Sequence, residues 1–190
     1  MRIKKFRKLL KDRELYPCLV TDLNDIKYLT GYSGTNAALL IDTKKSFFIS
    51  DSRYEEYICS ILPSGFRFLL QKGGLADAVR DAFLLTGKNV LHIQSGLVTY
   101  TFYMELKKKH RGIKIIPLDD DPVAEIRLVK DDGEIALFRR AAEITDACFE
   151  HLLGFIKPGM TEWDISIEID LFYKRNGCRG CSFDSIVASG

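Results

Sequence analysis

The side chains best suited to ligand contact in this sequence lie in the segment Asp51-Ser52-Arg53-Tyr54. The segment follows an expected strand at 46–50 and opens an expected helix, and such junctions in α/β sheets commonly face a ligand crevice. Arg53 could present a planar set of N–H donors to a carboxylate or a peptide carbonyl. Asp51 or Ser52 could simply cap the helix, and most arginines form only surface ion pairs, so a structural role for Arg53 is the simpler interpretation.

The loop Gly31-Tyr32-Ser33-Gly34 is the second candidate for ligand contact. Its two glycines favour a turn, which is the structural interpretation of the loop. The side chain of Tyr32 could instead line the rim of a binding site. Arg53 and Tyr32 are therefore the two candidate substrate-binding residues of this sequence.

No set of residues predicts a catalytic centre. Histidines, which often serve as bases or metal ligands, are far apart in the chain and share no motif: His92, His110 and His151. The acidic run Asp119–Asp121 is better explained as a solvated linker than as a cation site, because consecutive side chains do not converge on one point. We assign no catalytic residue and no metal ligand, and we expect no cofactor in this chain.

The cysteines favour structural roles. Their number, five, is odd and does not indicate a disulfide framework. Cys18, Cys59 and Cys148 lie among apolar residues and are expected to be small buried hydrophobic side chains. Cys178-Arg-Gly-Cys181 is a single CxxC pair, whereas a zinc site needs four ligands and no second pair completes one.

The composition is that of an ordinary globular chain, with 46% hydrophobic and 28% charged residues. A net charge of +2 is too small to favour nucleic acid or an anionic membrane as the main partner. No apolar run approaches the roughly 20 residues of a membrane span, and the N-terminus does not resemble a signal peptide. We therefore expect a cytoplasmic protein with no nucleic-acid and no membrane partner.

Seven basic residues lie within positions 2–14, interleaved with Ile3, Phe6, Leu9 and Leu10. A nucleic-acid-binding arm is one interpretation of this run. An amphipathic helix with a solvated basic face is the other, and we favour it because the apolar residues fall near helical spacing.

The elements that position these residues alternate between strand and helix up to residue 118. The patterns predict strands at 16–21, 37–41, 46–50, 66–70, 90–94 and 113–118, and helices at 52–62, 75–85 and 99–110. The short connection at 42–45 predicts an antiparallel hairpin. The fold class is therefore α/β, a three-layer domain in which helices flank a mixed β-sheet.

A boundary is expected at the acidic run and Pro122, because repelling charges and a proline disfavour regular structure. We place one domain at 1–121 and a second segment at 122–190. The second segment predicts two capped helices, one from Asp131 to about residue 155 and one after Thr161, with wide apolar faces. A buried strand is expected at 183–187, and we expect the segment to be the truncated start of a second domain.

Five motifs in order resemble those of the Xaa-Pro aminopeptidase and prolidase family of creatinase-type metallopeptidases. They are Asn24–Gly34 (NDIKYLTGYSG), Ser50–Tyr54 (SDSRY), Ile126–Lys130 (IRLVK) with the following Glu134-Ile135 and Ala141-Ala142, Lys157–Glu162 (KPGMTE) and Ser182–Gly190 (SFDSIVASG). Each motif is weak alone, but five in sequence at sensible spacing are specific. The resemblance covers nearly the whole chain.

The resemblance implies a metal-dependent peptidase that hydrolyses the Xaa-Pro bond at peptide N-termini or in dipeptides. It implies a creatinase/prolidase-type N-terminal domain followed by an α+β catalytic domain of the pita-bread fold. Relatives hold two divalent ions, often manganese, beyond the IVASG motif, so this chain alone is expected to be inactive and to serve oligomerisation and substrate access. Relatives use the arginine that corresponds to Arg53 to contact substrate, and they are commonly dimers, so a proline-containing peptide and a second copy are the expected partners.

Two alternatives share the fold. One is a creatinase-like enzyme that hydrolyses an amidino bond without metal, and the other is a catalytically dead interaction domain. The sequence does not separate an aminopeptidase from a strict dipeptidase.

Overall fold

A computed structural model describes residues 2–109 and 112–189 of the chain. Its residues form two compact units, Met1–Val129 and Lys130–Gly190. We expected the boundary at 121/122, eight residues earlier, and the difference comes from a helix at 122–128 that contacts the N-terminal helix of the first unit. His110, at the end of an expected helix, and Gly190, at the end of the last motif, lie outside the described residues.

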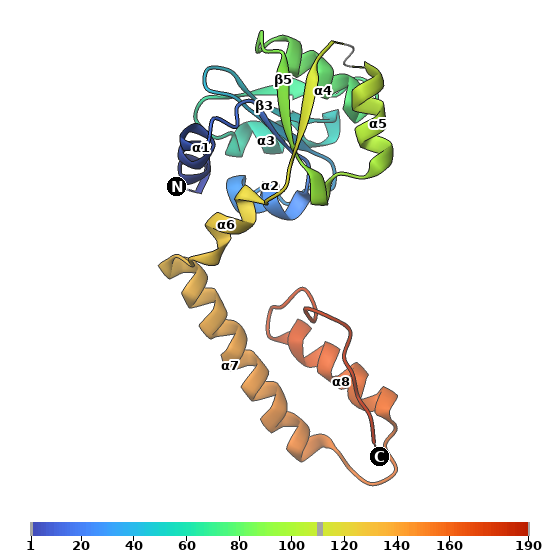
Figure 1. The fold of residues 1–190 in the computed structure, drawn as a ribbon. Helices are drawn as coiled ribbons and strands as arrows, with labels where there is room; N and C mark the ends of the chain where they lie inside the picture. Colours follow the sequence, from blue (N-terminus) through green and yellow to red (C-terminus); the bar gives the residue numbers. More distant parts are fainter. Residues whose placement is uncertain (1, 110–111, 190) are drawn as a thin grey trace. The chain divides into compact units, whose positions relative to one another are not determined.

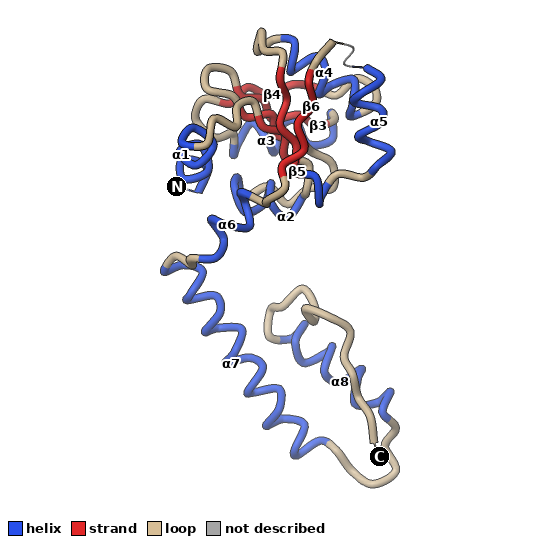
Figure 2. The backbone as a smooth tube through the Cα atoms, viewed as in Figure 1, coloured by secondary structure: helices blue, strands red, loops and turns tan. Residues whose placement is uncertain are grey.

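The first unit is built on a six-stranded sheet (Figures 1 and 2) with the order β4-β3-β2-β1-β5-β6. The strands are β1 Cys18–Val20, β2 Ala38–Ile41, β3 Ser46–Ser50, β4 Phe66–Leu70, β5 Val90–Gln94 and β6 Lys114–Leu118. Strand β2 runs antiparallel to both of its neighbours, and the other pairs are parallel. The expected mixed sheet and its β2–β3 hairpin are therefore confirmed.

Helices cover both faces of this sheet, which confirms the three-layer α/β fold. The helical elements of the unit are α1 Arg2–Asp12, α2 Leu23–Thr30, η1 Ser52–Tyr54, α3 Glu55–Ile61, α4 Leu75–Leu84, η2 Ser95–Leu97, α5 Tyr100–Lys109 and α6 Pro122–Leu128. Successive side chains of a strand point to opposite faces. Accordingly, Leu39 packs in one core with residues of α1, α2, α3 and α6, and Leu40 packs in the other with α4 and α5.

Helix α1 is the amphipathic helix that the spacing predicts. Phe6 and Leu10 are fully buried against the sheet, while its lysines are exposed. Arg7 lies between the two faces: its Nη2 donates to Ser46 Oγ at 3.0 Å, and its guanidinium stacks over the Phe66 ring. These contacts join α1 to the first residues of β3 and β4.

Two features of the first unit differ from the sequence expectations. Helix α2 was not expected; Asp22 caps its N-terminus by accepting a hydrogen bond from Asp25 N at 2.9 Å. The acidic run does not end in a solvated linker either. Asp121 caps α6, and Pro122 occupies the first turn of that helix, where a missing N–H costs nothing.

The second unit contains the two helices that the capping signals predict, α7 Asp132–Phe155 and α8 Glu162–Arg175. Both begin with a capping box, formed by Asp131 with Glu134 and by Thr161 with Asp164. The strand expected at 183–187 is wrong: these residues have no regular structure. A strand needs a neighbour for its N–H and C=O groups, and no described strand pairs with this segment.

Many apolar side chains of α7 and α8 face solvent, as expected. They include Leu137, Phe138, Phe149, Leu153 and Trp163, each more than 60% exposed. Among the described residues, no helix combines the length and the apolar character needed to cross a lipid bilayer.

Candidate functional site

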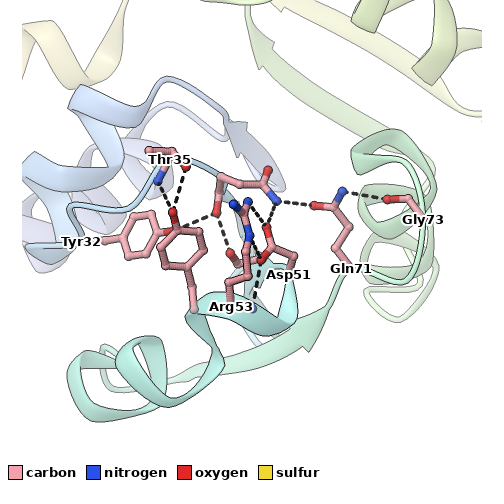
Figure 3. A network of polar contacts seen from close by, with 9 residues as sticks. Tyr32, Thr35, Asp51, Arg53, Gln71 and Gly73 are labelled. Atoms are coloured by element: carbon pink, nitrogen blue, oxygen red, sulfur yellow. Dashed lines mark hydrogen bonds and ion pairs between the residues drawn. The ribbon is translucent and has the colours of Figure 1, made fainter.

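Both candidate ligand-binding residues gather at one edge of the sheet, where β3 and β4 end and the antiparallel β2 begins. Register places Ser50 opposite Leu70 and Ala38 opposite Ile49, so the segments that adjoin these three strands are neighbours. Carboxyl ends of strands in α/β sheets are the usual position of ligand crevices. The polar network at this edge (Figure 3) is called the β2–β4 edge site, and the hydrogen bonds of its core join Asn36, Asp51, Arg53 and Gln71.

Asp51 and Arg53 form a two-point ion pair in this site. Arg53 Nε donates to Asp51 Oδ1 at 2.9 Å, and Arg53 Nη2 donates to Asp51 Oδ2 at 3.0 Å. Oδ1 also accepts the backbone N–H of Arg53 at 3.0 Å and so caps η1. The Asp51 side chain is 21% exposed and that of Arg53 is 67% exposed. The pair therefore presents a charged, solvent-accessible guanidinium at the sheet edge.

This arrangement changes the acidity of both groups. Hydrogen bonds from Arg53 and then from Asn36 hold the pKa of the Asp51 carboxyl well below its ordinary value. The Asp51 carboxylate raises the pKa of the Arg53 guanidinium. Each side chain thus favours the charged form of the other.

Two side-chain amides extend the network to β4. Asn36 Nδ2 donates to Asp51 Oδ2 at 2.6 Å and to Gln71 Oε1 at 3.0 Å. Gln71 Nε2 in turn donates to the carbonyl oxygen of Gly73 at 2.8 Å. The sequence reasoning missed Asn36 and Gln71, because nothing in the local pattern distinguishes them. Only the adjacency of the strand ends brings them to Asp51.

Tyr32 lies beneath the site and is fully buried. Its hydroxyl donates to the carbonyl oxygen of Asn36 at 2.8 Å, and its ring stacks against Tyr57 with centroids 5.6 Å apart. The loop passes close over this ring, since a Cβ atom on Gly34 would lie 2.1 Å from the Tyr32 hydroxyl oxygen. The structure therefore places Tyr32 as a support of the loop, not on an open rim. Whether Tyr32 or Arg53 touches a substrate stays a prediction.

Two further tyrosines fasten the loop to the helical segment after β3. The Tyr54 hydroxyl lies 2.8 Å from Thr35 Oγ1 and accepts the Thr35 N–H at 3.3 Å. Hydrogen bonding to Thr35 lowers the pKa of Tyr54. The Tyr57 hydroxyl donates to the Gly31 carbonyl oxygen at 3.3 Å. Hydrogen bonds thus join the loop before β2 to the segment after β3, which contains Arg53.

A second polar cluster, also missed by the sequence reasoning, lies where β5 ends. Gln94 Nε2 donates to Asp25 Oδ2 and to Asp121 Oδ1, both at 2.9 Å. Arg127 Nη1 donates to Asp25 Oδ1 at 3.0 Å. Asp25 is 1% exposed, and burial raises the pKa of its carboxyl despite the hydrogen bond from Gln94. This cluster connects α2, β5 and α6.

The remaining candidates have structural partners. His92 Nδ1 lies 3.3 Å from the Pro17 carbonyl oxygen, and His151 Nε2 lies 2.8 Å from Glu168 Oε1. Cys181 donates to Asp170 Oδ1 at 3.2 Å. Among residues 2–109 and 112–189, no group of three or more His, Cys, Asp or Glu side chains could hold a metal ion.

The cysteine expectations hold in part. Cys18 and Cys148 are buried, as expected, but Cys59 is exposed. Helix α3 buries only Ile58, and the side chain of the next residue points about 100° away around the helix. Cys59 therefore faces solvent despite its apolar neighbours in the sequence.

Comparison with known families gives two matches in sequence order. Residues 2–129 match the Creatinase/Prolidase N-terminal domain. Residues 136–190 match Metallopeptidase family M24.

Individual relatives match along the full chain. An uncharacterized peptidase, YqhT, from Bacillus subtilis is 30% identical over 190 residues, which are 100% of this chain and 53% of that protein. An Xaa-Pro dipeptidase from Pyrococcus horikoshii is 26% identical over 191 residues, covering 100% of this chain and 52% of that protein. The chain thus spans about half the length of the curated relatives it matches.

Solved structures agree with these matches. The structure of an Xaa-Pro dipeptidase from Bacillus anthracis superposes with a TM-score of 0.88 at 31% identity, covering 96% of this chain and 51% of that chain. A prolidase from Pyrococcus furiosus superposes with a TM-score of 0.84 at 21% identity, over 100% of this chain and 57% of that chain. The second likeness concerns the fold alone.

Proposed function

Because the chain belongs to the creatinase/prolidase N-terminal domain family and continues into the start of an M24 metallopeptidase domain, we propose that it is the N-terminal portion of an Xaa-Pro peptidase. The whole protein would hydrolyse the bond before proline at peptide N-termini or in dipeptides. The two consecutive family matches carry this proposal. The Bacillus anthracis Xaa-Pro dipeptidase, 31% identical along 96% of the chain, supports the same substrate class.

In this proposal Arg53 contacts the substrate. Its side chain is 67% exposed and is fixed at the sheet edge by Asp51. A guanidinium in this setting suits a carboxylate or a peptide carbonyl, because its N–H donors lie in one plane. Tyr32, which is buried, would act on the substrate only by supporting the loop and the carbonyl of Asn36.

The metal ions of the proposed reaction are assigned to no residue of this chain. The described residues do not fit such a site, because they form no group of three or more His, Cys, Asp or Glu side chains. A pair of divalent ions, manganese in our proposal, would activate a water molecule and polarise the scissile carbonyl. We accordingly propose that this chain alone is inactive and serves oligomerisation and substrate access.

We further propose that the chain associates with a second copy of itself and that the protein is located in the cytoplasm. The exposed apolar side chains of α7 and α8 support a partner surface, because patches of this kind mark interfaces. Light scattering of the chain over a concentration series measures self-association directly. A mass that stays monomeric across the series would remove oligomerisation from the proposal.

The proposal is tested by assaying the whole protein that carries this chain on Ala-Pro and Ala-Pro-Ala with added manganese. We expect chelation of the metal to lower the rate of hydrolysis of both proline peptides by at least about tenfold, since the metal supplies the nucleophile. We expect no hydrolysis of Ala-Ala-Ala. If neither proline peptide is hydrolysed, the result would support the interaction-domain alternative. Metal-independent hydrolysis of an amidino substrate such as creatine would support the creatinase-like alternative.

The role of Arg53 is tested separately with Arg53→Lys, which keeps the charge but loses the planar donors. We expect the KM for Ala-Pro to rise about tenfold, the usual size of one lost charge-assisted hydrogen bond. Arg80→Lys is the matched control, because Arg80 is a half-exposed arginine of α4 that pairs with Asp77 and with the neighbouring Asp81. Equal KM values for the two variants would contradict a substrate contact by Arg53.

A further inference from the structure

We infer that Asn36 and Gln71 are positioning residues for Arg53. The two side-chain amides orient the Asp51 carboxylate, and the carboxylate in turn fixes the guanidinium. The significance of this relay for peptide recognition rests on the proposed function. The relay consists of four hydrogen bonds between residues that adjoin three neighbouring strands. In order, these bonds join Gly73, Gln71, Asn36, Asp51 and Arg53.

The direction of every hydrogen bond in the relay is determined by its two ends. The carbonyl oxygen of Gly73 can only accept, so the amide nitrogen of Gln71 must face it. Gln71 Oε1 then faces Asn36, which must present its own nitrogen. At the other end the ionised carboxylate of Asp51 also only accepts, and the same nitrogen of Asn36 supplies its second hydrogen there. Neither amide can flip without losing bonds at both of its ends.

Helix capping alone does not account for the contact between Asn36 and Asp51. The cap of η1 uses Asp51 Oδ1, which accepts the backbone N–H of Arg53. Asn36 acts on the other oxygen, Oδ2, and that oxygen also accepts Arg53 Nη2. The hydrogen bond from Asn36 therefore restricts the rotation of the Asp51 carboxylate. The orientation of the carboxylate in turn sets the plane of the Arg53 guanidinium.

Rigid elements hold each member of the relay. Asn36 precedes β2, Asp51 follows β3 and Gln71 follows β4, and these three strands are adjacent in the sheet. The backbone of Asn36 is fixed independently of its side chain, because its carbonyl oxygen accepts hydrogen bonds from Tyr32 Oη and Ser50 Oγ. A change of the Asn36 side chain can thus alter the relay while the loop keeps its anchors.

The relay leaves a defined part of the guanidinium for a ligand. Asp51 occupies Nε and one hydrogen of Nη2. Nη1 and the second hydrogen of Nη2 remain directed away from Asp51. Because these donors lie in one plane, they suit a carboxylate or another planar oxygen acceptor, and a preorganised arginine loses less entropy on binding. The free carboxylate of a short proline peptide has this chemistry.

The test measures the order of the Arg53 side chain in this chain by nuclear magnetic resonance, without any peptide. Assignment of the Arg53 Nε–Hε signal rests on its loss in Arg53→Lys. We compare the wild type with Asn36→Ala, Asn36→Asp and Gln71→Ala, because the first variant removes the amide and the second replaces its donor by an acceptor of the same shape. Ser33→Ala is the control, since exposed Ser33 lies in the same loop and its hydroxyl lies 3.3 Å from the Tyr57 hydroxyl.

We expect the Nε–Hε hydrogen of Arg53 to exchange with water about fivefold faster in Asn36→Ala, the usual effect of one lost hydrogen bond. Its order parameter should fall in all three relay variants and stay unchanged in Ser33→Ala. Unchanged order in Asn36→Ala, with a backbone spectrum that shows a folded domain, would overturn the inference. Peptide hydrolysis by the whole protein tests the proposed function separately, so either claim can fail while the other stands.

Discussion

Asp25 and Arg127, which are 102 residues apart in the sequence, form an ion pair with 3.0 Å between Oδ1 and Nη1. The Asp25 side chain is 1% exposed, whereas that of Arg127 is 47% exposed. The ion pair therefore joins α6 to α2, and Arg127 lies on the solvent side of the buried Asp25 carboxylate. Gln94 holds the other oxygen of Asp25, so the carboxylate has a partner on each oxygen.

Arg127→Ala should destabilise the first unit. The change leaves the buried Asp25 carboxylate without its charge partner. A fully buried pair costs roughly 3–5 kcal/mol to break, and the half-exposed arginine reduces our expectation to about 2 kcal/mol. Hydrogen exchange of the sheet amides reports the unfolding free energy of this unit. Arg80→Ala, which removes a surface pair, is the control and should cost at most about 0.5 kcal/mol.

The pH dependence of stability should carry the signature of Asp25. Burial raises the pKa of its carboxyl in the folded state, so the folded state holds this proton more tightly than the unfolded state does. The contribution of Asp25 is fully present below the ordinary aspartate pKa and is lost as pH rises through the folded value. Carboxyl carbon chemical shifts measure the midpoint, and Asp25→Asn should abolish this part of the pH profile. A midpoint at or below that of exposed aspartates would contradict the assignment.

The sheet could be predicted from the sequence where strands are short apolar runs between breakers. Strands β3, β4 and β5 have the predicted bounds, 46–50, 66–70 and 90–94. Helix α2 was missed because it is only eight residues long and its periodicity is interrupted by polar residues. Its formation depends on tertiary burial of Ile26 and Leu29, which no local pattern reveals.

Only those residues of the candidate site that are close together in the sequence could be predicted. Asp51 and Arg53 are neighbours in sequence, so a strand-to-helix junction was enough to identify them. Asn36 lies 15 residues before Asp51 and 35 residues before Gln71. Their convergence depends on the strand order β4-β3-β2, which the sequence does not state. Likewise, the expected strand at 183–187 had no described partner, and its residues stay irregular.

Thiol reagents should distinguish the cysteines of the folded chain. Cys59 is exposed on α3. Burial raises the pKa of the Cys18 thiol to about 12, so almost no reactive thiolate exists at neutral pH. We expect iodoacetamide to modify Cys59 first and Cys18 only after unfolding in urea, as measured by mass spectrometry of peptides. Modification of both at similar rates in the native chain would show that Cys18 is accessible.

Gly34→Ala should disrupt the support of the candidate site. A Cβ atom at this position would lie 2.1 Å from the Tyr32 hydroxyl oxygen and 2.3 Å from Cζ of the same ring. The ring is fully buried between Phe48 and Tyr57, so it cannot move away without opening the core. Overpacking of this kind costs typically about 1–3 kcal/mol, and we expect a loss of about 2 kcal/mol in the unfolding free energy of the first unit.

The matched control for this substitution is Gly96→Ala, in a helical turn where a new Cβ atom meets nothing within 4 Å. It should change stability by at most about 0.5 kcal/mol. The Tyr32 hydroxyl would also lose its bond to the Asn36 carbonyl in Gly34→Ala, so the Arg53 Nε–Hε signal should become less ordered as well. If Gly34→Ala were as stable as Gly96→Ala, the close approach of the loop to Tyr32 would be wrong.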